Sequence, residues 1–230
     1  MFNSKYNKFL TVLLIIIILA IVGILIFLGV RYYKKVTTAM EKDGIIQQFD
    51  EQFGKEDNDS KDNNNTDNEK NENVTLNVNE NEISEGYSGG GSGGGQRLQF
   101  KGYGVLGKIK IPATGIEELV LDKVTTSSIE SAVAVLYGPG LNEVGNTVIV
   151  GHNYRDGSLF SNNKLLKEGD KIIISDEKGR QVVYTITKKY ITTAQDFAYA
   201  SRDTAGRREI SLSTCTDDSN SRLIIWASAD

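Results

Sequence analysis

The sequence lacks a second cysteine and any long basic tract, and each absence excludes a class of protein. With Cys215 as the only cysteine in 230 residues, no intramolecular disulfide can form, and the cysteine count leaves the cellular compartment open. Residues 86–230 carry 17 Lys and Arg against 16 Asp and Glu, so this region has no basic excess with which to bind nucleic acid. Its glycine-containing turns match neither a phosphate-binding loop nor a dinucleotide fingerprint.

Charge is also missing from a long stretch near the amino terminus. Residues 9–30, FLTVLLIIIILAIVGILIFLGV, form 22 uncharged residues that would reach roughly 33 Å as a helix. That length crosses a bilayer core of about 30 Å and exceeds the apolar core of a cleavable signal peptide. We therefore predict a single transmembrane anchor at 9–30, after a short cytoplasmic segment at 1–8. Basic residues flank the run on both sides, so charge alone leaves its orientation undecided.

Residues 31–96 contain few apolar side chains and are predicted to be a disordered tether. Within them, residues 41–85 carry 14 acidic and 4 basic side chains, and asparagine is abundant. Such a composition cannot bury enough apolar surface to fold. The run YSGGGSGGG at 87–95 predicts a flexible coil, whether it is natural or engineered. We assign this segment the role of a spacer without chemistry.

From residue 97 to 230 the pattern changes to short β-rich runs separated by turn residues. A DEKG turn between two of the runs predicts a hairpin, and SSIESAVAVLY at 127–137 has the spacing of a helix. Many short strands with one or two helices favour an all-β, closed barrel, since closure removes exposed sheet edges. The expected strands are 104–111, 118–122, 146–150, 171–175, 181–193, 209–214 and 222–228.

The only histidine, His152, and the only cysteine, Cys215, each follow an apolar β-run. Side chains at strand ends are rigidly placed and still reachable by substrate. If the last two strands pair antiparallel, Arg222 faces Cys215, where its guanidinium would favour the thiolate and stabilise an oxyanion. Taken singly, each residue has an ordinary explanation: a buried thiol, a turn histidine and a surface ion pair. Their combination instead favours a Cys-His nucleophilic site.

The same segments resemble the sortases, membrane-anchored cysteine transpeptidases of Gram-positive bacteria. Residues 211–215, SLSTC, stand where the family has a Thr-Leu-x-Thr-Cys strand end, and RLII at 222–225 stands in the Arg-led strand that follows. The segments 142–153 and 169–186 are similar to the family's histidine segment and central hairpin. Ser211 replaces the usual first Thr. GHNYRDGSLF and LSTC resemble class B, although only 63 positions separate His152 from Cys215, which leaves little room for the extra helix of that class.

The resemblance implies an eight-stranded sortase-type β-barrel and a two-step reaction. Cys215 would attack a carbonyl of an LPxTG-like sorting signal, Arg222 would stabilise the oxyanion, and His152 would protonate the leaving amine. Thr214 would line the substrate site, and Asn153 would either bind substrate or satisfy its own loop. The acceptor would be an amine of the cell wall or of a pilin. No cofactor is required, and no ligand spacing indicates a metal, calcium included.

The resemblance further implies a single-pass protein of the cell membrane, with its catalytic domain outside the cell. The sequence is also compatible with two alternative functions. One is a Cys-His peptidase that only hydrolyses its substrate. The other is a membrane-tethered, non-catalytic binding barrel with an inert thiol.

Overall fold

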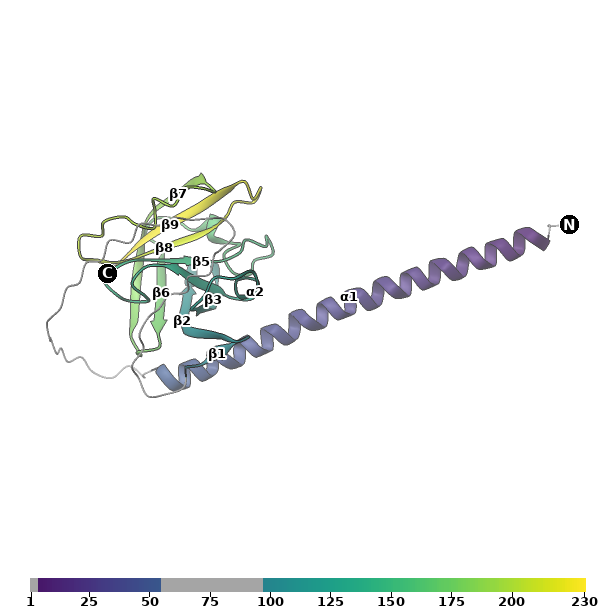
Figure 1. Cartoon of the computed structure of the whole chain (residues 1–230), viewed down its shortest axis with the longest axis horizontal. Helices are drawn as coiled ribbons and strands as arrows, with labels where there is room; N and C mark the ends of the chain where they lie inside the picture. Colours follow the sequence, from purple (N-terminus) through teal and green to yellow (C-terminus); the bar gives the residue numbers. More distant parts are fainter. Residues whose placement is uncertain (1–3, 55–96) are drawn as a thin grey trace. The chain divides into compact units, whose positions relative to one another are not determined.

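The computed structural model describes residues 4–54 and 97–230 (Figure 1). The glycine-rich run at 87–95 and most of the predicted tether therefore lie outside the described residues. The chain divides after Gly44 into two compact units, and the second begins at Ile45. The helical elements are α1 Ser4–Phe53, α2 Thr126–Ile129, and the short 3-10 turns η1 Pro112–Thr114 and η2 Asn163–Leu165.

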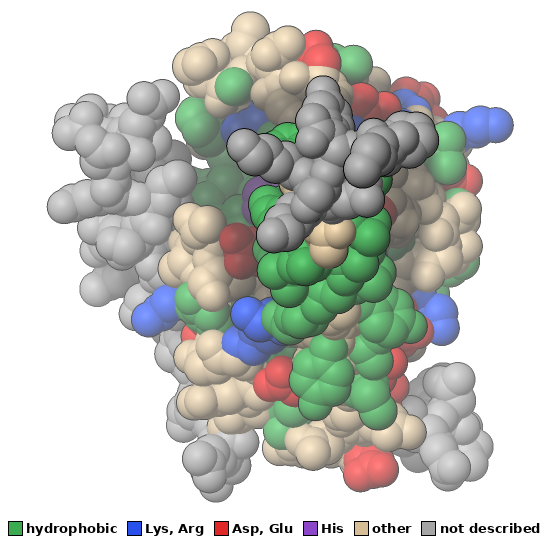
Figure 2. Space-filling view, turned by 90° about the vertical axis from the view of Figure 1, so that its right-hand side faces the viewer, with side chains coloured by type: hydrophobic (Ala, Val, Ile, Leu, Met, Phe, Trp, Pro, Cys, Tyr) green, Lys and Arg blue, Asp and Glu red, His purple; other side chains and the backbone are tan. Residues whose placement is uncertain are grey.

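The first unit is one long apolar helix, the greater part of α1. Every residue from 9 to 30 is exposed, and these side chains form a continuous hydrophobic surface (Figure 2). The stretch Phe9–Phe53 is long and apolar enough to cross a membrane. By the test of helix length and apolar composition, either a membrane anchor or a signal sequence near the amino terminus is consistent with α1.

The second unit is a closed β-barrel, which confirms the predicted fold class. Its sheet runs in the order β1-β2-β3-β4-β5-β8-β9-β7-β6, and β2 also pairs with β6. This last pairing joins the two sides of the sheet, so that β2–β9 form eight strands around one core (Figure 1). The strands are β1 Gln99–Phe100, β2 Tyr103–Ile111, β3 Ile116–Leu121, β4 Val133–Tyr137, β5 Gly145–Val150, β6 Lys171–Asp176, β7 Gln181–Thr193, β8 Arg208–Cys215 and β9 Ser221–Ala229.

The barrel closes where β2 approaches β6 at Gly107. A Cβ atom at this position would collide with the carbonyl oxygen of Ser175 and lie 2.7 Å from a methyl group of Leu141. Because only hydrogen fits there, glycine allows the two backbones to pair. The register of β2 against β3 also shifts between Val105 and Gly107, and such bulges bend a strand around a barrel.

The predicted helix at 127–137 is wrong. The structure has one short turn, α2, capped by Thr125, whose Oγ1 accepts a hydrogen bond from the Ser128 amide at 3.0 Å. The following β4 pairs parallel with β3 and antiparallel with β5. Val133 and Val135 face the barrel core, whereas Ala134 packs in a second cluster outside it. A strand buried on both faces is a continuous apolar run, which periodicity alone cannot distinguish from a helix.

The predicted start of the disordered tether at residue 31 is also wrong, because α1 continues to Phe53. Its last two turns place Ile45, Ile46, Phe49 and Phe53 on the cluster that contains Phe100. These four positions follow helical spacing, so one apolar face covers the barrel wall. The composition of the tether concealed this face, since polar residues surround it.

Contact between this helix end and the barrel is reinforced by a charged cluster on β2. Lys108 Nζ lies 2.7 Å from Asp50 Oδ2 and 3.0 Å from Glu117 Oε1. Burial alone would raise the pKa of Glu117, but the hydrogen bond and charge of Lys108 outweigh it and lower that pKa. The carboxylate therefore stays ionised beside the lysine.

Tyr184 is expected to make the barrel less stable at alkaline pH. Burial raises its pKa from 10.0 to about 12, and its hydroxyl donates to Asn142 Oδ1 at 3.1 Å. The folded state thus favours the protonated phenol, so this stabilisation is complete below pH 10 and is lost as pH rises towards 12. We expect the free energy of unfolding to fall by about 3 kcal/mol across that window.

Urea denaturation of the wild type and Tyr184→Phe at pH 8 and at pH 11.5 measures this contribution. Tyr184→Phe should lose the hydrogen bond at both pH values and should show a smaller decrease between them. An equal decrease in both proteins would contradict the assignment to Tyr184.

Candidate active site

Cys215 and Arg222 face each other at one end of the β8–β9 hairpin. The strands pair antiparallel, as the sequence predicts, and these two residues form the last aligned pair. Arg222 Nη1 donates to Cys215 Sγ at 3.0 Å, and both side chains are half-buried. A guanidinium this close interacts more favourably with a thiolate than with a thiol.

His152 reaches the same end of the barrel from the neighbouring strand. β5 and β8 run parallel, with Val150 aligned to Ser213. The Gly151 amide continues the ladder by donating to the Ser213 carbonyl at 3.3 Å. His152 and Cys215 therefore leave adjacent strands at the same edge. The half-buried imidazole lies against the ring of Tyr154, with 5.0 Å between ring centroids.

Thr214 and Asn153 connect the strand ends that carry His152 and Cys215. Thr214 Oγ1 donates to the Gly151 carbonyl at 2.7 Å, which ties β8 to the segment that carries His152. Asn153 Nδ2 donates to the Cys215 carbonyl at 3.0 Å. Both contacts join the segment that carries His152 to the end of β8.

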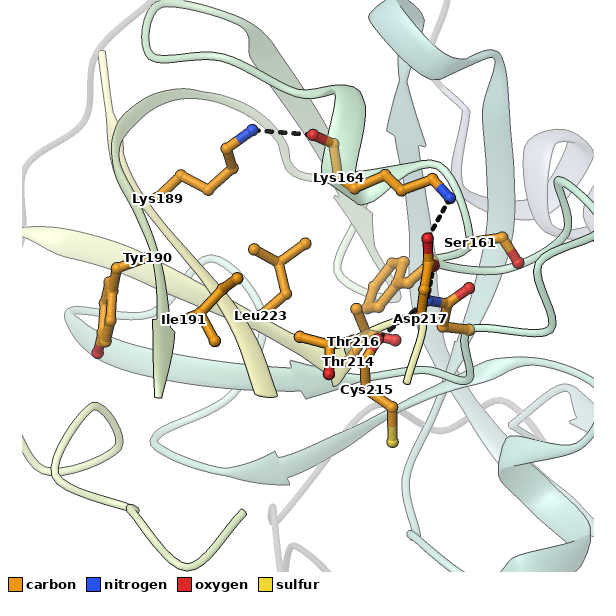
Figure 3. Close-up of a pocket in the computed structure, with 12 residues that line it drawn as sticks. Ser161, Lys164, Lys189, Tyr190, Ile191, Thr214, Cys215, Thr216, Asp217 and Leu223 are labelled. Atoms are coloured by element: carbon orange, nitrogen blue, oxygen red, sulfur yellow. Dashed lines mark hydrogen bonds and ion pairs between the residues drawn. The ribbon is translucent and has the colours of Figure 1, made fainter. Parts of the chain in front are cut away.

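A pocket of about 480 Å³ borders the end of β8 (Figure 3). Thr214, Cys215 and Asn153 line it, whereas His152 and Arg222 are not among its lining residues in the described part of the chain. In Figure 3 the sulfur of Cys215 points away from the middle of the pocket. The Cys215–Arg222 pair thus lies beside this pocket and not at its centre. The remaining walls include Phe160, Ser161, Lys164, Lys189, Tyr190, Ile191, Asp217 and Leu223.

The described residues, 4–54 and 97–230, contain no group of three or more His, Cys, Asp or Glu placed to hold a metal ion. The chemistry that they can support is a thiolate nucleophile, a cation beside it and an imidazole on the adjacent strand end. This combination suits acyl transfer through a thioester.

The family model for the sortase domain matches residues 109–230, which is more than half of the chain and includes all three residues. The chain belongs to the sortase family. The resemblance inferred from the sequence is therefore confirmed at the level of the family.

Several sortases are similar to this one in sequence or structure. Sortase A of Bacillus anthracis is 31% identical over 124 residues, which cover 53% of this chain and 58% of that protein. This sortase thus spans less than two thirds of the length of that relative. Among solved structures, a lid mutant of sortase A from Corynebacterium diphtheriae matches with a TM-score of 0.51 and 25% identity, covering 56% of this chain and 71% of that one.

A pilus-related sortase C of Group B Streptococcus matches with a TM-score of 0.50 and 26% identity, covering 55% of this chain and 67% of that one. The relatives therefore include both sortase A and sortase C, and they do not determine a subclass for this sortase.

Tyr199, which lies in the segment between β7 and β8, was not predicted from the sequence to lie near Cys215. Its side chain is 2% exposed, and its hydroxyl donates to Ser213 Oγ at 3.3 Å, two residues before Cys215. Burial raises the pKa of this phenol. Asn146 holds the segment in place by donating to the carbonyls of Tyr199 and Ala200, each at 2.9 Å. The two hydrogen bonds of Asn146 join β5 to a segment more than 50 residues later, so no local sequence motif indicates them.

Proposed function

We propose that this sortase is a cysteine transpeptidase that cleaves an LPxTG-like sorting signal and transfers the protein to an amine of the cell wall or of a pilin. The observation that supports this most strongly is the 3.0 Å contact between Arg222 Nη1 and Cys215 Sγ at the strand edge that also carries His152. Membership of the family and similarity to a pilus-related sortase C support the substrate class.

In the first step the thiolate of Cys215 attacks the carbonyl carbon of the Thr–Gly bond of the signal. A C–S bond forms, and Arg222 stabilises the oxyanion. The C–N bond then breaks as the His152 imidazolium gives its proton to the leaving amine, which leaves a thioester on Cys215.

In the second step the acceptor amine attacks this thioester. His152 takes the proton of the amine, a new amide bond forms, the C–S bond breaks and the Cys215 thiolate is regenerated. Neither step changes an oxidation state, and the proton that His152 gives in the first step is taken back in the second, so the reaction needs no cofactor.

The long apolar helix α1 supports a membrane location. Residues 9–30 would anchor the protein as a single span, with 1–8 in the cytoplasm and the catalytic domain, 97–230, outside the cell. Fixing the enzyme to the membrane raises its effective concentration towards membrane-held substrates. Residues 55–96 would act as a tether in this arrangement.

The subclass that we infer is a sortase with class B-like motifs on a short barrel. GHNYRDGSLF and LSTC carry the likeness to class B. Between His152 and Cys215 the helical content is the single turn η2, which differs from the extra helix expected of that class.

Mass spectrometry of the products distinguishes transpeptidation from the two alternatives. The full-length protein in detergent is incubated with an LPxTG peptide, with and without an oligoglycine amine. We expect the amine to appear in a ligated product, and Cys215→Ala should form none. Hydrolysed peptide alone would indicate a peptidase, whereas no turnover together with alkylation of Cys215 only in denaturant would indicate a binding barrel.

A further inference from the structure

The loop that joins Cys215 to Arg222, residues 216–220, contains two aspartates with different surroundings. Asp218 is bonded within its own loop, where it accepts from the Asn220 amide at 3.1 Å and from the hydroxyl of Thr216 at 2.5 Å. Asp217 instead points out of the loop, towards Lys164 (Figure 3). The first aspartate therefore shapes the loop, and the second connects it to another part of the barrel.

Each oxygen of the Asp217 carboxylate takes a hydrogen bond from the segment that follows His152. Asn153 Nδ2 donates to Oδ1 at 2.9 Å, and Lys164 Nζ donates to Oδ2 at 2.7 Å. These two hydrogen bonds, from Lys164 and then Asn153, lower the pKa of Asp217, so it remains ionised at neutral pH. We call the three residues Asn153, Lys164 and Asp217 the latch.

The latch touches both halves of the proposed catalytic site through Asn153. The same Nδ2 that bonds Asp217 also bonds the Cys215 carbonyl, while the side-chain oxygen Oδ1 accepts from the Arg155 amide at 3.1 Å. Accepting from a backbone donor orients the amide so that its nitrogen faces Cys215. Since Asn153 follows His152 directly, one side chain relates the positions of the histidine and cysteine backbones.

A second contact holds the tip of the loop. Arg155 Nη2 lies 3.0 Å from Ser219 Oγ, and Ser219 adopts a left-handed backbone conformation with φ of 63°. Loop 216–220 is thus held at two points by the segment after His152.

We propose that Asp217 is a positioning residue that holds the loop 216–220 against the segment after His152. It thereby keeps the side chains of Cys215, Arg222 and His152 correctly placed relative to one another. The proposal rests on the proposed transpeptidase function. The Asp217 carboxylate bonds to Asn153 and Lys164, and in this proposal it acts on the reacting groups through these two residues. Displacing reacting groups by about 1 Å can cost on the order of a hundredfold in rate, so a loop contact can control turnover.

The chain offers a matched control in a second exposed ion pair. Lys171 Nζ lies 2.8 Å from Asp230 Oδ2, with side chains 48% and 49% exposed, against 48% and 52% for Lys164 and Asp217. Exposed pairs of this kind add little to stability. Asp217→Ala and Asp230→Ala should therefore both melt close to the wild-type temperature, and only the first should alter catalysis.

We expect Asp217→Ala to lower kcat for peptide ligation by about tenfold with little change in KM, while Asp230→Ala keeps the wild-type kcat. Asp217→Asn keeps one acceptor oxygen but places a donor NH2 group where the other oxygen stood, so it should recover only part of the loss. Because Asn153 and Asp217 act on one contact, the double alanine variant should be no slower than the slower single variant. A kcat for Asp217→Ala equal to that of Asp230→Ala would overturn the proposal.

Hydrogen exchange tests the latch independently of activity. In the full-length protein, exchange in the segment 209–226 should be about tenfold faster in Asp217→Ala than in wild type or Asp230→Ala. Unchanged exchange would overturn the latch even if turnover fell. Faster exchange in a protein that ligates no sorting peptide would sustain the latch and reject the transpeptidase function. If Asp217→Ala fails to fold, the same ligation kinetics and hydrogen-exchange measurements are made on Lys164→Met and Asp217→Asn, and unchanged values in both variants would overturn the proposal.

Discussion

Replacing Arg222 with alanine is expected to lower kcat/KM for sorting-peptide ligation by about a hundredfold to a thousandfold. Arg222 faces Cys215 across β8 and β9 and donates to its sulfur at 3.0 Å. In the proposed mechanism the guanidinium stabilises the thiolate before attack and the oxyanion afterwards. Losing one preorganised donor at a developing oxyanion typically has an effect of that size.

Two further variants separate charge from geometry. Arg222→Lys keeps the charge but not the planar fork of donors, so it should recover only part of the rate. Arg208→Ala removes an exposed arginine from the opposite end of β8 and should leave kcat/KM unchanged. Steady-state kinetics on the three proteins, with circular dichroism to verify folding, decide the result. Near-normal turnover in Arg222→Ala would reject the oxyanion role.

Replacing Phe49 with alanine is expected to destabilise the barrel unit by about 3 kcal/mol, although the residue lies on α1. Its side chain is 1% exposed and packs in the cluster with Phe100, Leu119 and Leu121. Without the phenyl ring this cluster keeps a cavity or loses the helix end altogether. In either case apolar surface on the barrel wall is exposed to water.

Denaturant unfolding of the chain from residue 45 onwards measures this effect. Gln48→Ala is the control, because Gln48 is the exposed neighbour of Phe49 on the same helix. A chain that starts at residue 97 should be less stable still and should bind a hydrophobic dye. Equal stability of Phe49→Ala and Gln48→Ala would show that the helix end does not stabilise the barrel.

Much of the site could be predicted from local pattern. The alternating apolar runs and the DEKG turn identify β6 and β7, and the run ahead of Cys215 identifies β8. Once β8 and β9 are known to be consecutive strands, a short loop makes antiparallel pairing of Cys215 with Arg222 the expected result. The apolar run at 9–30 is visible for the same reason, since its composition alone determines its preference for an apolar medium.

Other features depended on contacts between distant segments. Residues 133–137 are a strand because β3 and β5 supply partners on both sides, although the run itself also suits a helix. The last turns of α1 are helical in a polar region of the sequence because Phe49 packs against side chains of the barrel. Asp217 acquires two donors only because the loop after His152 folds back beside it.

The sequence by itself thus determined the apolar helix and the strand-rich domain, and it singled out Cys215, Arg222 and His152 as the proposed nucleophile, cation and imidazole. These follow from composition and short-range spacing, which are properties of the chain before it folds. Tertiary structure alone decided how β2 closes on β6, which strand lies beside β5, what α1 covers and what Asp217 holds. Each of these depends on backbone or side-chain partners more than 30 residues apart, and such partners leave no periodic signal in the sequence.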